Sequence, residues 1–171
     1  VVDCITASKT HGKDGFGGLA DFFDENDKQD LSDKHAVNLI AEIIKNSDEK
    51  VTIIAIGPLT NIATLFTIYP EVKNNIEVIS IMGGSTSVGN VTAKSEFNFY
   101  VDPEAANIVL NSGVPIILSG LNVTLSAYIK DEEIDKIENL GTNLAIVAAK
   151  IVREYKKQDP ALHDPVAVLA L

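Results

Sequence analysis

The chain has 171 residues, 46% of them hydrophobic, and a formal net charge of −10 at pH 7. This length and apolar content are typical of one globular domain with a sizeable core, and they exclude a disordered chain. The negative charge argues against nucleic acid as a partner because phosphate binding needs clustered Lys and Arg, and no apolar run is long enough to enter a membrane as a span.

The single cysteine of the chain, Cys4, cannot form an internal disulfide. A lone cysteine is typical of a reducing compartment. The first residues also lack the basic start and the long apolar stretch of a secretory signal. We therefore expect a cytoplasmic protein, in which Cys4 is a small buried apolar residue rather than a nucleophile.

The first predicted elements are a helix, a strand and a second helix. Residues 51–56 are short, β-branched and continuously apolar, as expected of a strand that is covered on both faces. Gly57-Pro58 then turns the chain into a helix over residues 59–67. Before this strand, residues 35–44 have a helical apolar spacing that places on one face Ala36, Leu39, Ile40, Ile43 and Ile44.

A second buried strand is predicted over residues 76–82, and it ends at Gly83-Gly84. Residues 89–101 are polar and irregular by comparison. Asp102-Pro103-Glu104 predicts the start of a helix, with Asp as N-cap, Pro at the first helical position and an acid in the first turn. A third strand is predicted over residues 114–118.

Two further helices are predicted, near residues 131–138 and over residues 143–157, and Asp164-Pro165 repeats the helix-start signal. Alternation of strand and helix with short links predicts an α/β fold, an open, mostly parallel, Rossmann-like sheet with helices on both faces. We expect residues 1–171 to belong to a single domain.

Ligands of such sheets bind at the carboxyl ends of the strands. The positions to consider are therefore those directly after Ile56, Met82 and Leu118. They hold the least core-like sequence in the chain.

The polar segment after the second strand suits a sugar with vicinal hydroxyls. Asn90 and Asn98 offer amides and Glu96 offers a carboxylate, while each hydroxyl can both donate and accept. If residues 96–98 are extended, Glu96 and Asn98 face the same way. The alternative interpretation is a polar loop that caps its own backbone, and composition alone favours it.

His163 and Asp164 also allow two interpretations. Asp164 could cap the last helix, or it could bind a hard cation at the strand ends, although one carboxylate is too few for calcium, which takes about six to eight oxygens. His163 could equally be a surface or a core histidine. A His-Asp pair in isolation does not decide between these roles.

Several motifs occur in a fixed order along nearly the whole chain: Gly57-Pro58-Leu59-Thr60-Asn61, Met82-Gly83-Gly84, Gly89-Asn90, Glu96-Phe97-Asn98, Val101-Asp102-Pro103-Glu104-Ala105-Ala106 and His163-Asp164-Pro165. Together they resemble the inosine-uridine-preferring nucleoside hydrolase family. The block from Glu96 to Ala106 is the most specific part. The segment from His11 to Gly18 resembles the substrate-side loop of the family, and Gly120-Leu121-Asn122-Val123-Thr124 resembles another of its segments.

The resemblance implies the nucleoside hydrolase fold and an enzyme of nucleoside catabolism and of purine or pyrimidine salvage. Such an enzyme cleaves the N-glycosidic bond of ribonucleosides to ribose and free base with a water activated by Ca²⁺. Its partner is a small-molecule ribonucleoside, and we expect a homo-oligomer. No residue of this chain distinguishes purine from pyrimidine.

By the same resemblance, Asp164 would be a calcium ligand, and Ile56 would supply a second ligand through its backbone carbonyl. His163 would lie near the leaving base as a catalytic proton donor, a task suited to histidine near neutral pH. His11 would flank the base pocket.

The resemblance also assigns the ribose site. Asn90, Glu96 and Asn98 would hold the ribose hydroxyls, with Asn98 counted among the catalytic residues, and Met82 would lie against the sugar. Departure of the base builds positive charge on the ribose, so a nearby carboxylate stabilises the oxocarbenium-like transition state.

The chain departs from the family pattern at both ends. It has no Asp-rich motif after a first strand, which in the family supplies most calcium ligands, and it lacks the region after His163-Asp164-Pro165 that helps to close the site in the family. We therefore expect part of a longer domain. The alternative is a non-catalytic fragment or ligand-binding remnant. A dinucleotide-binding domain is disfavoured because no G-x-G-x-x-G follows a strand.

Overall fold

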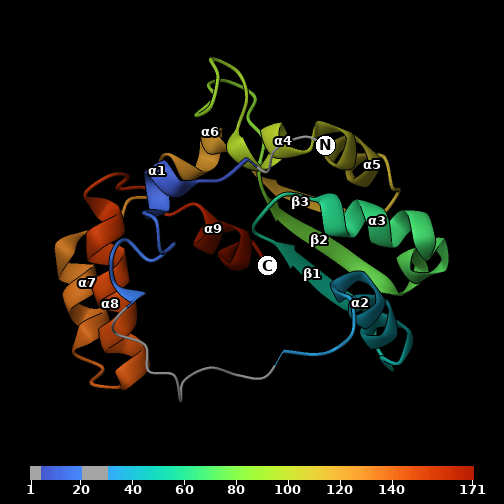
Figure 1. Cartoon of the computed structure of the whole chain (residues 1–171), viewed down its shortest axis with the longest axis horizontal. Coiled ribbons are helices and arrows are strands. Elements are labelled where there is room, and N and C mark those ends of the chain that lie inside the picture. The colour runs from blue at the N-terminus through green and yellow to red at the C-terminus, as the bar shows by residue number, and fades with distance from the viewer. Residues whose placement is uncertain (1–4, 21–30) are drawn as a thin grey trace. The chain divides into compact units, whose positions relative to one another are not determined.

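A computed structural model of the chain describes residues 5–20 and 31–171 (Figure 1). Cys4, which carries the expectation of a cytoplasmic location, lies outside these residues. The described residues fall into two units: a helical unit drawn from the ranges Val1–Leu31 and Tyr128–Ala161, and a sheet unit of Ser32–Ala127 with Leu162–Leu171. The expectation that residues 1–171 are one domain stays a prediction.

Three parallel strands form the centre of the sheet unit in the order β1-β2-β3. They are β1 (Val51–Ala55), β2 (Ile76–Met82) and β3 (Ile116–Ser119). The register places Ala55 opposite Ile81 and Ile81 opposite Leu118. The predicted strand over 114–118 begins two residues late because Pro115 has no N–H to donate to the ladder.

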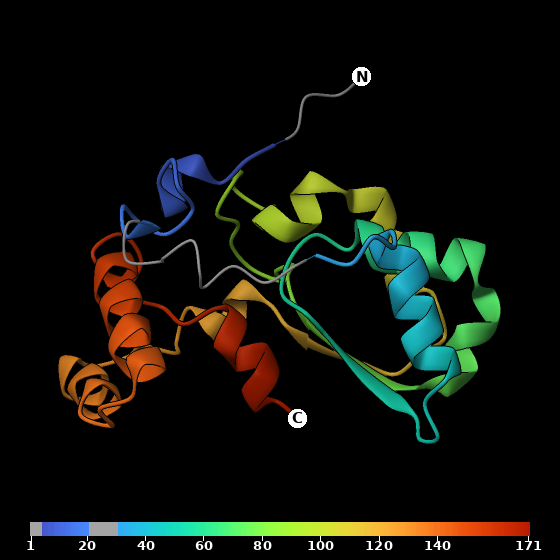
Figure 2. The ribbon, with the colours of Figure 1, turned by 60° about the horizontal axis from the view of Figure 1, so that its bottom comes forward.

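Helices cover both faces of this sheet, as predicted (Figures 1 and 2). One face packs against α2 (Ala36–Lys45), α3 (Thr60–Ile68), a 3₁₀ helix (Pro70–Asn75) and α5 (Pro103–Leu110). The opposite face carries α9 (Asp164–Leu169), where the hydroxyl of Ser80 donates to the carbonyl of Ala167 at 2.5 Å. The predicted α/β class is therefore confirmed.

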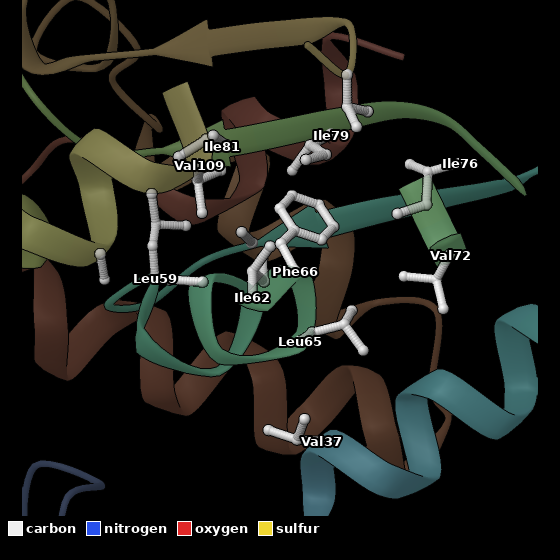
Figure 3. Close-up of a cluster of buried hydrophobic side chains, with 14 of the residues drawn as sticks. Val37, Leu59, Ile62, Leu65, Phe66, Val72, Ile76, Ile79, Ile81 and Val109 are labelled. Atoms are coloured by element: carbon white, nitrogen blue, oxygen red, sulfur yellow. The ribbon is translucent and has the colours of Figure 1, made fainter. Parts of the chain in front are cut away.

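The main core lies between the sheet and α3 (Figure 3). Alternation along β2 sends Ile79 and Ile81 into this core, where both side chains are fully buried. Ser80 and Met82 consequently face α9, and Met82 packs with Leu121 and Ala167. Other labelled members of the main core are Val37, Leu59, Ile62, Leu65, Phe66, Val72, Ile76 and Val109.

Two details of the sheet unit differ from expectation. The buried face of α2 is formed by Val37, Ala41 and Ile44, whereas Ile43 is 55% exposed, so the predicted face is rotated. In β1, Ile54 is 41% exposed, because α9 packs mainly against β2 and leaves that face of β1 open in the part of the chain that the structure describes.

Short helices position the loops at the strand ends, and sequence periodicity did not predict them. They are α4 (Phe97–Val101) and α6 (Leu121–Thr124). The helix start at Asp102 was predicted, and its carboxylate accepts from the N–H of Ala105 at 2.9 Å. A helix of four or five residues is too short to have a hydrophobic period of its own.

The helical unit contains α1 (Ser8–His11), α7 (Asp131–Glu138) and α8 (Asn143–Lys156), the last two as predicted. Ion pairs of 2.6 and 2.7 Å join Arg153 of α8 to Asp135 and Glu138 of α7. An antiparallel β-bridge between Tyr128 and Ala161 pairs the two ends of the range Tyr128–Ala161. Over residues 5–20 and 31–171, no helix has the length and apolar character to cross a membrane.

Candidate active site

The carboxyl ends of the three parallel strands meet at one edge of the sheet. Because Ala55 is paired with Ile81, Ile56 comes level with Met82 at this edge. The N–H of Gly83 donates to the carbonyl of Ser119 at 3.3 Å, and the N–H of Leu121 donates to the carbonyl of Gly84 at 3.0 Å. The turns after β2 and β3 are therefore joined directly.

The turn after β2 requires glycine. Gly84 has a φ of +68°, a conformation that L side chains rarely adopt. A Cβ on Gly83 would lie 2.5 Å from the ring of Phe99. Because the ring of Phe99 lies so close to Gly83, α4 packs against the end of β2. The polar residues of the predicted ribose site, at the start of α4, therefore lie there too.

Glu96 is buried, with 2% of its surface exposed, and its carboxylate caps α4. One oxygen accepts from the N–H of Gly84 at 2.8 Å and of Phe99 at 3.1 Å, and the other accepts from the N–H of Asn98 at 2.8 Å. The condition of an extended 96–98 segment is therefore not met, since Asn98 is helical. The backbone-capping interpretation is confirmed for Glu96, and its contact with ribose stays a prediction.

Asn98 is held against the end of β2. Its Nδ2 donates to the carbonyl of Met82 at 3.1 Å, and 9% of Asn98 and 3% of Met82 are exposed. The structure thus brings together three predicted site residues, Met82, Glu96 and Asn98, through their own hydrogen bonds. Their roles toward a substrate stay predictions.

Asn90 lies in an exposed loop and reaches the same cluster through the backbone. Its Oδ1 accepts from the N–H of Phe97 at 2.9 Å. The loop is closed by the N–H of Asn90, which donates to the carbonyl of Ser95 at 3.1 Å. Asn90 is therefore tied to the start of α4.

His163 contacts Thr124, a residue for which no role was predicted. Its Nδ1 lies 2.8 Å from Oγ1 of Thr124, the last residue of α6, and Thr124 is fully buried. Thr124 belongs to the Gly120–Thr124 segment of the family resemblance, which was the only signal that could have singled it out. The N–H of Leu162 also donates to the carbonyl of Ala127 at 2.7 Å, so this part of the chain is held beside α6.

The predicted calcium ligands have suitable chemistry but are too few. Asp164 is half-buried and is the first residue of α9, one position after the N-cap His163, and Ile56 follows β1. Calcium takes about six to eight oxygens. Within residues 5–20 and 31–171, no group of three or more His, Cys, Asp or Glu could hold a metal. Asp164 and Ile56 thus offer the oxygen atoms that calcium prefers, but they offer too few of them to hold the ion alone.

His11 belongs to the helical unit, whereas Met82, Glu96 and Asn98 belong to the sheet unit. Its ring stacks on that of Tyr155 in α8, with centroids 5.6 Å apart and planes inclined by 10°. A cavity of about 100 Å³ lies beside the pair. Drug-sized ligands usually occupy pockets of about 300–1,000 Å³, so this cavity does not hold a nucleoside.

The whole sequence matches a described protein family. The profile of the inosine-uridine preferring nucleoside hydrolases matches residues 1–171. The pyrimidine-specific ribonucleoside hydrolase RihA of Photobacterium profundum is 40% identical over 175 residues, covering 97% of this chain and 56% of that protein. The RihA of Enterobacter sp. is 38% identical, with 97% and 55% covered.

A solved structure supports the same relationship. The purine-preferring ribonucleoside hydrolase from Gardnerella vaginalis superposes with a TM-score of 0.84 at 31% identity, over 95% of this chain and 54% of that one. The chain therefore spans about half the length of the relatives that it matches.

Proposed function

Because the chain belongs to the inosine-uridine preferring nucleoside hydrolase family, we propose that the protein containing it hydrolyses the N-glycosidic bond of ribonucleosides. Water bonds to C1′ of the ribose and gives up one proton, the C1′–N bond breaks with its electron pair going to the base, and the leaving base takes up one proton. The products are ribose and free base.

The observation that carries this proposal is the buried Glu96–Asn98 pair at the end of β2. Three backbone N–H groups hold the Glu96 carboxylate in one position, so a negative charge is fixed before a substrate arrives. Such a preorganised charge stabilises the positive ribose of the transition state without reorganisation. Nδ2 of Asn98 donates to the carbonyl and to the sulfur of Met82, and the amide oxygen of Asn98 can accept from a hydroxyl.

Asn90 and His163 complete the proposed assignment. Asn90 binds a ribose hydroxyl from the loop above α4, and Met82 lies against the sugar. His163 gives a proton to the leaving base, and with Nδ1 on Thr124 the transfer uses Nε2. His11 flanks the base. Each role is carried over from the family resemblance to the residue at the matching position.

Calcium is the proposed metal. Asp164 and the carbonyl of Ile56 would supply two of its oxygens, and the rest would come from water, from ribose hydroxyls and from other residues of the protein that contains this chain. When bound, calcium would orient a water and lower its pKa. We also retain as proposals a cytoplasmic homo-oligomer and a role in nucleoside catabolism and salvage.

The deciding experiment measures base release from ribonucleosides and from their 2′-deoxy counterparts by chromatography. We expect ribonucleosides to be favoured by at least about 10²-fold in kcat/KM, since a site built to bond a hydroxyl rejects an analogue that lacks it. Asn98→Ala should remove most of the activity, and Asn74→Ala, an exposed asparagine before β2, should not. Equal rates on inosine and 2′-deoxyinosine would contradict the proposal. Ribonucleoside binding without any base release would favour the non-catalytic alternative.

For the base we propose a pyrimidine. The RihA relatives at 38–40% identity are described as pyrimidine-specific, whereas the purine-preferring hydrolase from Gardnerella vaginalis is 31% identical. Comparison of kcat/KM for uridine, cytidine and inosine tests this choice. A higher value for inosine than for both pyrimidine nucleosides would reverse it.

A further inference from the structure

The loop that follows His11 is organised around a single carboxylate. Oδ1 of Asp14 accepts from the N–H of Phe16 at 3.1 Å and of Gly18 at 3.0 Å, and Oδ2 accepts from the N–H of Ala20 at 3.1 Å. We call residues 12–20 the glycine loop. Its backbone winds around one exposed side chain rather than around an apolar core.

The glycine loop needs its glycines for this path. A positive φ is found at Gly12, Gly15, Gly17 and Gly18. At Gly12 the φ is +75°, and a Cβ there would lie 3.2 Å from Oδ1 of Asp14, so a larger residue would be strained and would crowd the carboxylate. The glycines therefore allow the backbone to follow this path around Asp14.

The same arrangement holds the backbone of His11. The N–H of Gly17 donates to the carbonyl of His11 at 2.9 Å, between two of the amide groups that Asp14 binds. Gly17 also faces α8, since a Cβ on it would lie 3.6 Å from Cβ of Glu154. The loop thus closes against the helix that carries Tyr155, on whose ring His11 stacks.

The charge of Asp14 contributes to the loop. The N–H of Gly18, and then those of Phe16 and Ala20, lower the pKa of Asp14 below its usual value. By linkage, a group with a lowered folded-state pKa stabilises the folded loop above the unfolded pKa, and this contribution is lost as the pH falls through the folded pKa. Near neutral pH the carboxylate is therefore in its stabilising form.

We propose that Asp14 is a positioning residue for ligand binding, because its carboxylate folds the glycine loop and so fixes the ring of His11 on Tyr155. The effect of Asp14 on ligand binding rests on the proposed function, in which His11 flanks the base. Asp14 itself touches no substrate. The cavity beside the pair is too small for a nucleoside, so the loop serves the placement of His11 and not a second nucleoside site.

The test compares Asp14→Ala and Asp14→Asn in the protein that contains this chain. Asparagine keeps one acceptor oxygen, which can serve Phe16 and Gly18, but has an NH₂ where Oδ2 met Ala20. Alanine keeps neither. We therefore expect a graded effect, larger for alanine. Asp48→Ala is the control, because Asp48 is an exposed acid outside the glycine loop.

The first measurement is the ring resonance of His11 in protein labelled with ¹³C-histidine, identified by its loss in His11→Gln. Tyr155→Leu supplies the chemical shift of the unstacked ring. We expect Asp14→Ala to move the His11 resonance toward that value, Asp14→Asn to move it part of the way, and Asp48→Ala to leave it in place. A purely local defect at Asp14 would not change the stacking of a ring three residues away.

The second measurement is steady-state base release. We expect Asp14→Ala to raise KM roughly three- to tenfold and to leave kcat within about twofold, since His11 contributes to binding and not to bond cleavage. An unchanged His11 resonance in Asp14→Ala overturns the proposal. A moved resonance with unchanged KM overturns its ligand-binding part. If even the unaltered protein releases no base, the proposed function fails, and the resonance alone then decides whether Asp14 positions His11.

Discussion

Oγ1 of Thr124 lies 2.8 Å from Nδ1 of His163, across 39 residues of sequence, and Thr124 is fully buried. A hydroxyl can donate or accept, so Thr124 can stay bonded to Nδ1 whether or not that nitrogen carries a proton. The contact therefore restrains the orientation of the His163 ring.

If His163 is the proton donor, Thr124→Val should lower kcat roughly ten- to a hundredfold, because the isosteric side chain fills the same space but removes the hydroxyl that contacts Nδ1 of His163. Thr124→Ser keeps the hydroxyl and should stay within about threefold of the unaltered protein. Steady-state base release measures both. Full turnover in Thr124→Val would show that His163 does not depend on this bond.

Asp164→Asn separates the metal role of Asp164 from a helix-terminal one. An acid in the first turn of α9 contributes about 0.3–1 kcal/mol through the helix dipole, so the metal-free protein should lose no more than this. Loss of a residue that only supports a metal ligand costs roughly 10- to 100-fold in metal affinity. If Asp164 is itself a calcium ligand, Asp164→Asn should therefore weaken calcium binding by more than this. Thermal unfolding of the metal-free protein measures its stability. Titration with calcium in a calorimeter measures its metal affinity. Near-normal turnover at low calcium would refute the metal assignment.

Glu96→Gln should lower the free energy of unfolding by about 2–3 kcal/mol, since an amide NH₂ replaces an oxygen that now accepts from backbone N–H groups in a buried site. Glu104→Gln makes the same chemical change at an exposed position of α5 and should cost less than about 0.5 kcal/mol. Denaturant unfolding compares the two. Equal stability of both variants would mean that the capping bonds of Glu96 contribute nothing.

Gly83→Ala should lower the free energy of unfolding by about 1–3 kcal/mol, because the new methyl group meets the ring of Phe99 at 2.5 Å. The cost should shrink in a Phe99→Leu background, where the smaller side chain gives way. Gly57→Ala is the matched control, since a Cβ there meets nothing within 4 Å. A similar loss in both glycine variants would exclude the Phe99 contact as the cause.

Sequence by itself determined the elements whose signals are local. The end of β2 follows from an apolar-rich segment closed by Gly83 and Gly84, and the start of α5 follows from Asp102 and Pro103. Hydrophobic runs, caps and breakers act over a few residues, so they can be recognised without knowledge of the fold. The motifs of the family resemblance also contain the residues of the candidate site.

Only the tertiary structure decided how those residues are held. The family resemblance assigns Glu96 to ribose, yet its carboxylate accepts from three N–H groups, one of them in the turn after β2. Thr124 became visible as the partner of His163 only when α6 and the segment before α9 met. Likewise, the buried face of α2 depends on what packs against it. Such contacts join residues that are distant in sequence, and chain topology, rather than local propensity, brings them within bonding distance.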